Sequence, residues 1–72
     1  MKRELLNTPR TMALVSELRS EGVKMALFSD KIIGFVDGEQ VFKAEKGNFG
    51  YVCHLSDRIL IDKATDSVLV SA

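Results

Sequence analysis

The sequence predicts an α+β fold, with an N-terminal helix packed on a bent antiparallel sheet or a small barrel of five to six short strands. Two observations support this prediction. A hydrophobic stripe with helical spacing lies near the N-terminus, and short apolar runs separated by turn residues follow it. Parallel neighbours would need crossovers of roughly a dozen residues, and the intervening segments are too short for that. At 72 residues the chain is expected to form a single domain, residues 1–72.

The helix is predicted over residues 9–21. Thr8 and Pro9 are typical of a helix start, because threonine caps the free N–H groups and proline at the first helical position loses no hydrogen bond. Gly22 suits the position after the last turn, where a left-handed conformation is common. The expected buried stripe, at the spacing i, i+3, i+4, i+7, consists of Thr11, Leu14, Val15 and Leu18.

A β-hairpin is expected next, after a short apolar strand at residues 23–28. Asp37-Gly38 favours a two-residue turn, which would place Ile33 opposite Phe42. Gly34 would then mark a bend or a bulge. The face of this hairpin expected to enter the core carries Ile33, Phe35, Phe42 and Ala44.

Three further strands are expected in FGYVCHL, RILI and SVLVS, with a loop at residues 46–48 before the first of them. Cys53 and His54 are adjacent on a strand and would point to opposite faces, so they cannot form a thiolate–imidazole pair there. We therefore expect a core cysteine beside a surface histidine.

Composition and charge exclude several classes of function. One cysteine forms no internal disulfide, and one cysteine with one histidine cannot supply the usual four ligands of structural zinc. We expect no metal, no cofactor, no membrane segment and a cytoplasmic location. The net charge of zero disfavours nucleic acid as a partner. Residues 1–24 nevertheless carry five basic and three acidic side chains, whereas residues 25–72 carry five basic and seven acidic.

Five aspartates fall at predicted turns, where their side chains bond the local backbone. They are Asp30, Asp37, Asp57, Asp62 and Asp66. A carboxylate-pair hydrolase would need two of them to converge in a cleft, for which a chain this short leaves little room. We therefore expect the protein not to be an enzyme.

Residues 1–7 form an N-terminal segment for which the sequence allows a flexible conformation. In one hypothesis, the leucines of this segment pack back onto the domain. In the other, the segment extends from the domain and docks on an acidic surface of a partner. We favour one leucine packing inward while the basic end reaches outward. The candidate partner-binding residues are Lys2, Arg3, Leu5, Leu6 and Arg10.

A second candidate patch for nucleic acid or another contact combines Lys43 and Lys46 with Phe49 and Tyr51. Exposed aromatic rings near lysines can stack on single-stranded RNA or DNA. The alternative, which we favour, places both aromatic rings in the core.

The predicted order of a helix followed by strands, with a strand pair bent at a glycine, resembles the Sm-like family of ring-forming RNA-binding proteins. That resemblance implies a small-barrel single-stranded RNA binder, but it assigns no uridine-pocket residue here. The start MKRELLNTPRT and the chain length resemble small bacteriophage regulators of host takeover, which bind host RNA polymerase and inhibit or reprogram transcription. The function expected first is thus non-enzymatic and steric, exerted on a larger protein complex; the RNA binder is the alternative.

Overall fold

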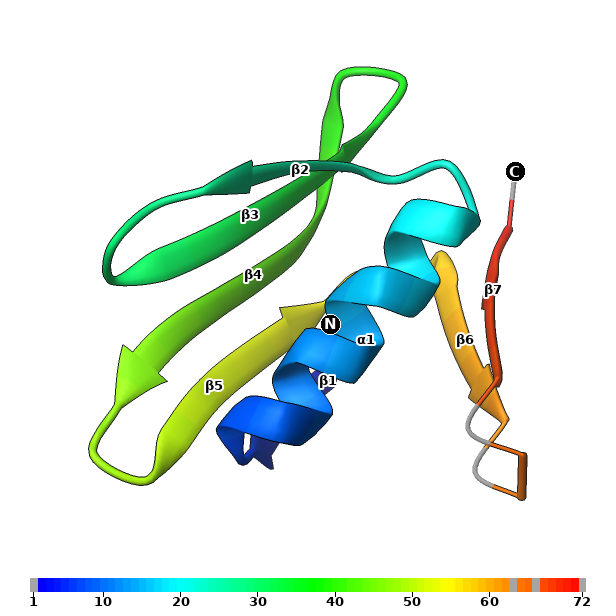
Figure 1. Cartoon of the computed structure of the whole chain (residues 1–72). Coiled ribbons are helices and arrows are strands. Elements are labelled where there is room, and N and C mark those ends of the chain that lie inside the picture. Colours follow the sequence, from blue (N-terminus) through cyan, green and yellow to red (C-terminus); the bar gives the residue numbers. More distant parts are fainter. Residues whose placement is uncertain (1, 63, 66, 72) are drawn as a thin grey trace.

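The computed structural model describes residues 2–62, 64–65 and 67–71. It contains one helix and seven strands in the described part of the chain (Figure 1). In chain order these are β1 (Lys2–Leu6), α1 (Thr8–Ser20), β2 (Lys24–Leu27), β3 (Lys31–Val36), β4 (Glu39–Gly47), β5 (Gly50–Leu55), β6 (Ile59–Asp62) and β7 (Ser67–Val70).

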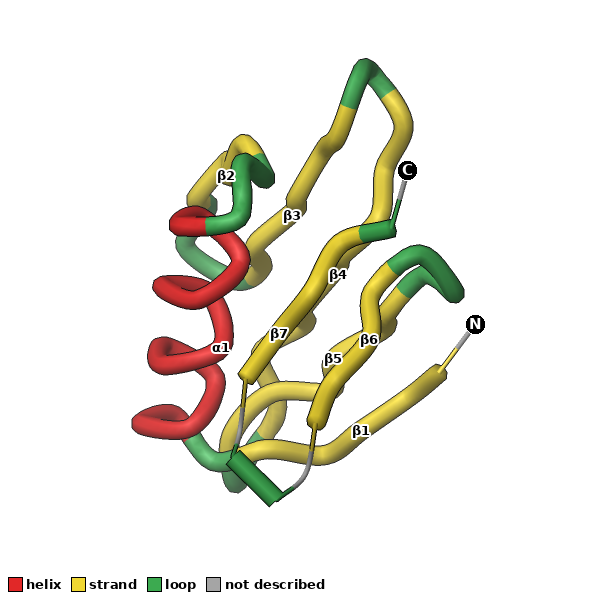
Figure 2. Tube along the Cα trace, turned by 90° about the vertical axis from the view of Figure 1, so that its right-hand side faces the viewer, coloured by secondary structure: helices red, strands yellow, loops and turns green. Residues whose placement is uncertain are grey.

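The strands form a five-stranded sheet in the order β1-β5-β4-β3-β2 and a separate two-stranded sheet, β6-β7. All neighbouring strands are antiparallel, so β1 and β2 run parallel at opposite edges and α1 connects them across one face. The β6-β7 hairpin lies beside α1, over that same face (Figures 1 and 2). The α+β class is therefore confirmed. The described five-stranded sheet is not closed into a barrel. Together with the β6-β7 hairpin, the described residues form seven strands, whereas five to six were expected.

Helix α1 is confirmed one residue earlier than predicted. Its N-cap is Asn7 rather than Thr8: Asn7 Oδ1 accepts a hydrogen bond from the Arg10 backbone N–H at 2.9 Å. Gly22 follows the helix with φ +93°, the left-handed conformation expected of it. The whole predicted stripe from Thr11 to Leu18 is buried.

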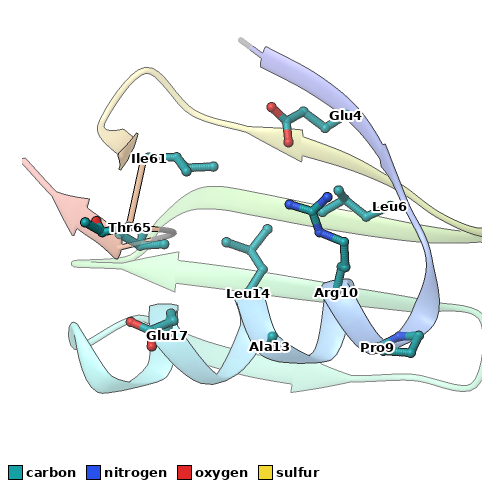
Figure 3. A pocket seen from close by; sticks show the side chains of 10 residues that line it. Glu4, Leu6, Pro9, Arg10, Ala13, Leu14, Glu17, Ile61 and Thr65 are labelled. Atoms are coloured by element: carbon teal, nitrogen blue, oxygen red, sulfur yellow. The ribbon is translucent and has the colours of Figure 1, made fainter. Parts of the chain in front are cut away.

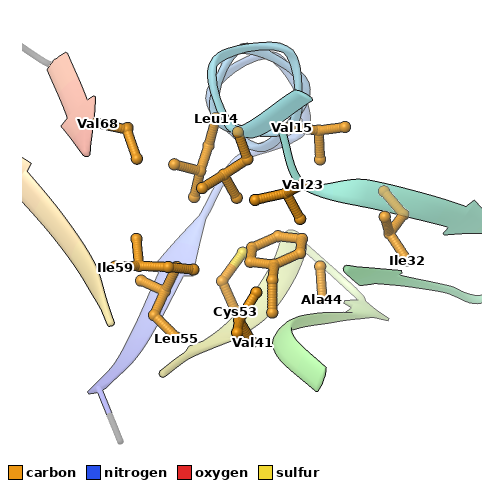
Figure 4. Packing of buried hydrophobic residues seen from close by; sticks show 12 residues of the cluster. Leu14, Val15, Val23, Ile32, Val41, Ala44, Cys53, Leu55, Ile59 and Val68 are labelled. Atoms are coloured by element: carbon orange, nitrogen blue, oxygen red, sulfur yellow. The ribbon is translucent and has the colours of Figure 1, made fainter. Parts of the chain in front are cut away.

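The core lies between the sheet on one side and α1 with β6-β7 on the other (Figure 4). The inward face of α1 meets side chains of β3, β4 and β5, and β6 and β7 close the core at one end of the sheet. The buried apolar side chains are Leu14, Val15, Leu18, Val23, Ile32, Val41, Phe42, Ala44, Cys53, Leu55, Ile59 and Val68.

The hairpin at Asp37-Gly38 is confirmed, but the predicted core face is half wrong. The register shifts between Gly34 and Phe35, so that Gly34, not Ile33, lies opposite Phe42. Ile33 and Phe35 then point away from the core and are only partly buried, whereas Ile32 is buried. A bulge adds one residue to one strand and reverses the faces beyond it, which a simple two-residue periodicity cannot anticipate.

The N-terminal segment is an edge strand rather than a free end. Residues 2–6 pair with β5, with Arg3 opposite His54 and Leu5 opposite Val52. Gly50 permits this close approach: a Cβ there would collide with the backbone carbonyl oxygen of Leu6. The missing side chain of Gly50 thus leaves the space that the end of β1 occupies.

The sheet has a second face, turned away from α1, which we call the outer face. Directly paired residues point to the same side, so Arg3 and Lys43 share the outer face with His54. The buried Ala44 and Cys53, one residue along each strand, point to the core instead.

Candidate functional site

The five N-terminal candidate residues do not form one patch. Arg3 and Leu5 lie on the outer face, and the Leu5 side chain is 73% exposed. Lys2 and Leu6 point to the opposite side of the sheet, and Leu6 packs against the core. Arg10 belongs to the first turn of α1 and is exposed. One leucine therefore packs inward and the other is held out, as the sequence favoured.

A groove of about 410 Å³ runs between β1, α1 and the β6-β7 hairpin (Figure 3). Its floor is apolar, with Leu6, Leu14 and Val68, and charged side chains stand at its rim. Arg10 extends from α1 toward β1, and Glu17 lies farther along the helix (Figure 3). The groove therefore places Arg10 beside Leu6, but apart from Arg3 and Leu5.

The second candidate patch is also divided. Phe49, in the turn between β4 and β5, is 90% exposed, against the favoured core placement. Tyr51 is half-buried against the core and lies directly opposite Lys46. Lys43 points to the outer face, where its Nζ lies 3.7 Å from Glu45 Oε1. The structure thus gathers Lys46, Phe49 and Tyr51 at one end of the sheet and leaves Lys43 elsewhere.

Two further apolar side chains are exposed at that end. Leu27, the last residue of β2, is 60% exposed, and Phe28, in the turn that follows, is 54% exposed. Lys31 Nζ lies 5.4 Å from the centre of the Phe28 ring. A backbone hydrogen bond from Lys46 N–H to the Asp30 carbonyl, 2.9 Å long, ties this turn to β4. Sequence reasoning missed both, because it assigned residues 23–28 to a buried strand.

Cys53 is a buried core residue. Its Sγ lies 4.0 Å from Thr11 Oγ1, and the Thr11 hydroxyl donates to the Asn7 carbonyl at 2.9 Å. Burial raises the pKa of the Cys53 thiol; the Thr11 contact lowers it and the charge of Glu4 raises it. The thiol is held protonated inside the core, and the thiolate that nucleophilic chemistry requires is disfavoured.

Among the residues that the structure describes, no group of three or more histidine, cysteine, aspartate and glutamate side chains could hold a metal ion. Asp30, Asp37 and Asp57 lie at turns, and Asp62 ends β6 and accepts a hydrogen bond from the Ala64 N–H at 3.0 Å. Asp66 lies outside the described residues. No helix in the described ranges is long and apolar enough to cross a membrane.

Side chains that sequence reasoning did not select lie on the outer face together with Arg3 and Leu5. Lys31 and Ile33 of β3, Phe35 beyond the bulge, and Val52 of β5 share that face through the strand register. Their grouping depends on which strand lies beside which, and no local pattern in the sequence carries that information.

No family model matches the chain, and neither the curated proteins nor the solved structures contain a significant match to it.

Proposed function

We propose that this protein is a small non-enzymatic regulator that acts by docking on a larger protein assembly. The observation that carries the proposal is the 73% exposure of Leu5 on a sheet face that no described element covers. Its neighbour Leu6 packs against the core, so the fold buries part of one leucine side chain and leaves the other exposed to solvent. Exposed apolar side chains beside charged ones are typical of protein interaction surfaces.

The proposed mechanism is steric. A small folded body held on a larger complex blocks or redirects the surface it covers, and this requires no reactive group. The resemblance to small phage regulators makes bacterial RNA polymerase the first assembly to test, with inhibited or altered transcription as the functional readout.

The test immobilises the full chain and measures binding to purified bacterial RNA polymerase, with capture from a bacterial lysate in parallel. Leu5→Ser should weaken capture of the same assembly, since it removes an apolar contact without disturbing the core. Leu69→Ser is the matched control, because Leu69 is 61% exposed on β7, away from the sheet. Equal capture by wild type and Leu5→Ser would contradict a role for this strand. Failure to capture any protein would contradict the proposal that this chain is a protein-binding regulator.

Single-stranded RNA binding is a second candidate, favoured by one observation: Phe49 is 90% exposed in the turn between β4 and β5, three residues from Lys46. An exposed ring next to a cation can stack on a base. Phe49→Ala should then abolish binding to oligouridylate at low salt, measured by fluorescence anisotropy. Absence of any oligouridylate binding by the wild-type chain would exclude this candidate.

A further inference from the structure

The outer face concentrates positive charge in a chain whose net charge is zero. Its strand residues include four basic side chains and one acidic side chain, identified by the pairing of each strand with the next. The basic residues are Arg3, Lys24, Lys31 and Lys43, and the acidic residue is Glu45. Among the residues that the structure describes, the other charged side chains lie on α1 and its C-cap, on the opposite side of the sheet, on the β6-β7 hairpin or at turns. The neutral net charge of the sequence therefore accompanies a basic outer face.

Three of these basic side chains, Arg3, Lys31 and Lys43, lie close enough together to act jointly. Lys43 is paired with Ile33, and Lys31 is two residues farther along β3, which makes the two lysines diagonal neighbours about 7–8 Å apart. Arg3 lies one strand beyond His54 on the same row as Lys43. Spacings within about 10 Å, the screening length at moderate salt, let the potentials of such charges add.

Protection of sheet edges explains only part of this pattern. Natural proteins place lysine on edge strands to prevent pairing with other chains, which would account for Arg3 on β1 and Lys24 on β2. Lys31 and Lys43, however, lie on the interior strands β3 and β4. Their position therefore calls for a reason other than blocking an edge.

The one acidic residue, Glu45, offsets only one of the four basic charges. Glu45 Oε1 lies 3.7 Å from Lys43 Nζ and 3.7 Å from His54 Nε2, and Glu45 is also the cross-strand partner of Lys31. A hollow of about 240 Å³ opens beside Lys43, Glu45 and His54. A carboxylate of a partner that enters this hollow would compete with Glu45 for the ion pair with Lys43.

The uncharged side chains on the outer face are mostly aliphatic. Leu5, Ile33 and Val52 accompany two half-buried rings, those of Phe35 and His54. Stacking on nucleic acid bases requires exposed aromatic rings, whereas aliphatic side chains among cations fit a protein surface of matching composition.

Building on the proposed function, we propose that the outer face is the docking surface and that its partner is a protein segment whose acidic side chains flank aliphatic ones. Carboxylates of the partner pair with Lys31, Lys43 and Arg3, and its aliphatic side chains cover Leu5 and Val52. The face is about 19 Å across its five strands, which suits one helix or one extended segment rather than a broad interface.

The experiment follows amide resonances of the ¹⁵N-labelled full chain during titration with three probes. These are a short peptide of glutamate and leucine residues, the same peptide with glutamine replacing glutamate, and oligouridylate of equal charge. The acidic peptide should shift resonances of β1, β3, β4 and β5 on the outer face. Equal binding of the glutamine peptide, or tighter binding of oligouridylate, would overturn the proposal.

Matched variants separate the two faces of the sheet. Lys43→Glu should weaken the acidic peptide about tenfold, whereas Lys46→Glu, the same change on the same strand but on the opposite face, should alter affinity less than about twofold. Glu45→Gln should strengthen binding, because it removes the competing carboxylate. Indistinguishable affinities for Lys43→Glu and Lys46→Glu would contradict the assignment of the face.

The same variants distinguish failure of this inference from failure of the proposed function. If a protein assembly is captured equally by wild type and Lys43→Glu, the docking function stands and the outer face is not its site. If the acidic peptide binds the outer face but no protein assembly is captured, the surface is confirmed and the regulatory function fails.

Discussion

Gly34 lies on β3 between Met25 of β2 and Phe42 of β4. A Cβ at this position would lie 2.9 Å from Val23 Cγ1, 3.0 Å from Met25 Sδ and 3.1 Å from Phe42 Cβ. The buried valine and phenylalanine have little freedom to move in a close-packed core. The absence of a side chain at Gly34 therefore permits the register in which it faces Phe42.

Gly34→Ala should lower the free energy of unfolding by about 1–3 kcal/mol, because the added methyl group overpacks the core. Urea denaturation monitored by circular dichroism measures the change. Gly47→Ala is the control, since a Cβ there meets only the Gly50 carbonyl oxygen at 3.7 Å. Equal stability of the Gly34 variant and wild type would show that the core can accommodate the methyl group.

Cys53 gives the protein a defined dependence on alkaline pH. Burial raises the pKa of the thiol in the folded chain above its ordinary value of 9.0. The folded state thus holds this proton more tightly than the unfolded state does. The corresponding stability is fully present below pH 9.0 and is lost as the pH rises toward the folded-state pKa.

Cys53→Ala should therefore flatten the decline of stability above pH 9.0, although the variant is less stable than wild type at neutral pH. Urea denaturation of both proteins across that pH range measures the two slopes. Parallel declines would indicate that other groups account for the alkaline loss.

At the scale of elements, the start of α1 shows how the cap is chosen. Both Asn7 and Thr8 can cap a helix, but only Asn7 has the extended backbone of a cap, with φ −69° and ψ 168°. The Asn7 carbonyl also accepts hydrogen bonds from the Thr11 N–H and hydroxyl, each at 2.9 Å. Asn7 therefore joins β1 to the helix and to the buried Thr11.

Asn7→Ala should lower the free energy of unfolding by about 1 kcal/mol, because the Arg10 N–H loses its side-chain acceptor. Thr8→Ala, at the first helical residue, should change it by less than about 0.5 kcal/mol. Thermal unfolding of both variants compares the two positions directly. A larger loss of stability in Thr8→Ala than in Asn7→Ala would indicate that Thr8 caps the helix, as the sequence suggested.

At the scale of the whole molecule, the β6-β7 hairpin depends on the rest of the domain. Ile59 and Val68 are buried against the shared core. Arg58 extends from the start of this hairpin to Glu39 on β4, with Nη1 3.6 Å from Oε2. The two sheets therefore complete a single core, and we expect one cooperative unfolding transition.

Val68→Ala should lower the stability of the whole domain by roughly 2 kcal/mol rather than releasing the hairpin alone. Far-ultraviolet circular dichroism reports on α1, and the amide resonances of β6 and β7, followed through the same denaturant titration, report on the hairpin. The two probes should give coincident transitions in wild type and variant. Separate midpoints would show that the hairpin unfolds independently.

The sequence by itself determined the features that depend on near neighbours along the chain. The stripe of α1, the glycine that ends it, the hairpin at Asp37-Gly38 and the α+β class all follow from local periodicity and turn chemistry. The inward packing of Leu6 and the exposure of Leu5 agree with the same local reasoning.

Only the tertiary structure decided what depends on distant segments. Residues 2–6 form a strand because they pair with the backbone of β5, and Gly50 leaves room for the backbone of Leu6. The extra residue on β4, Val41, shifts the register so that Ile33 and Phe35 point outward while Phe42 and Ala44 point to the core. The basic outer face exists because pairing aligns side chains from four separate strands, and strand pairing is set by contacts between residues far apart in the chain, which local propensities do not encode.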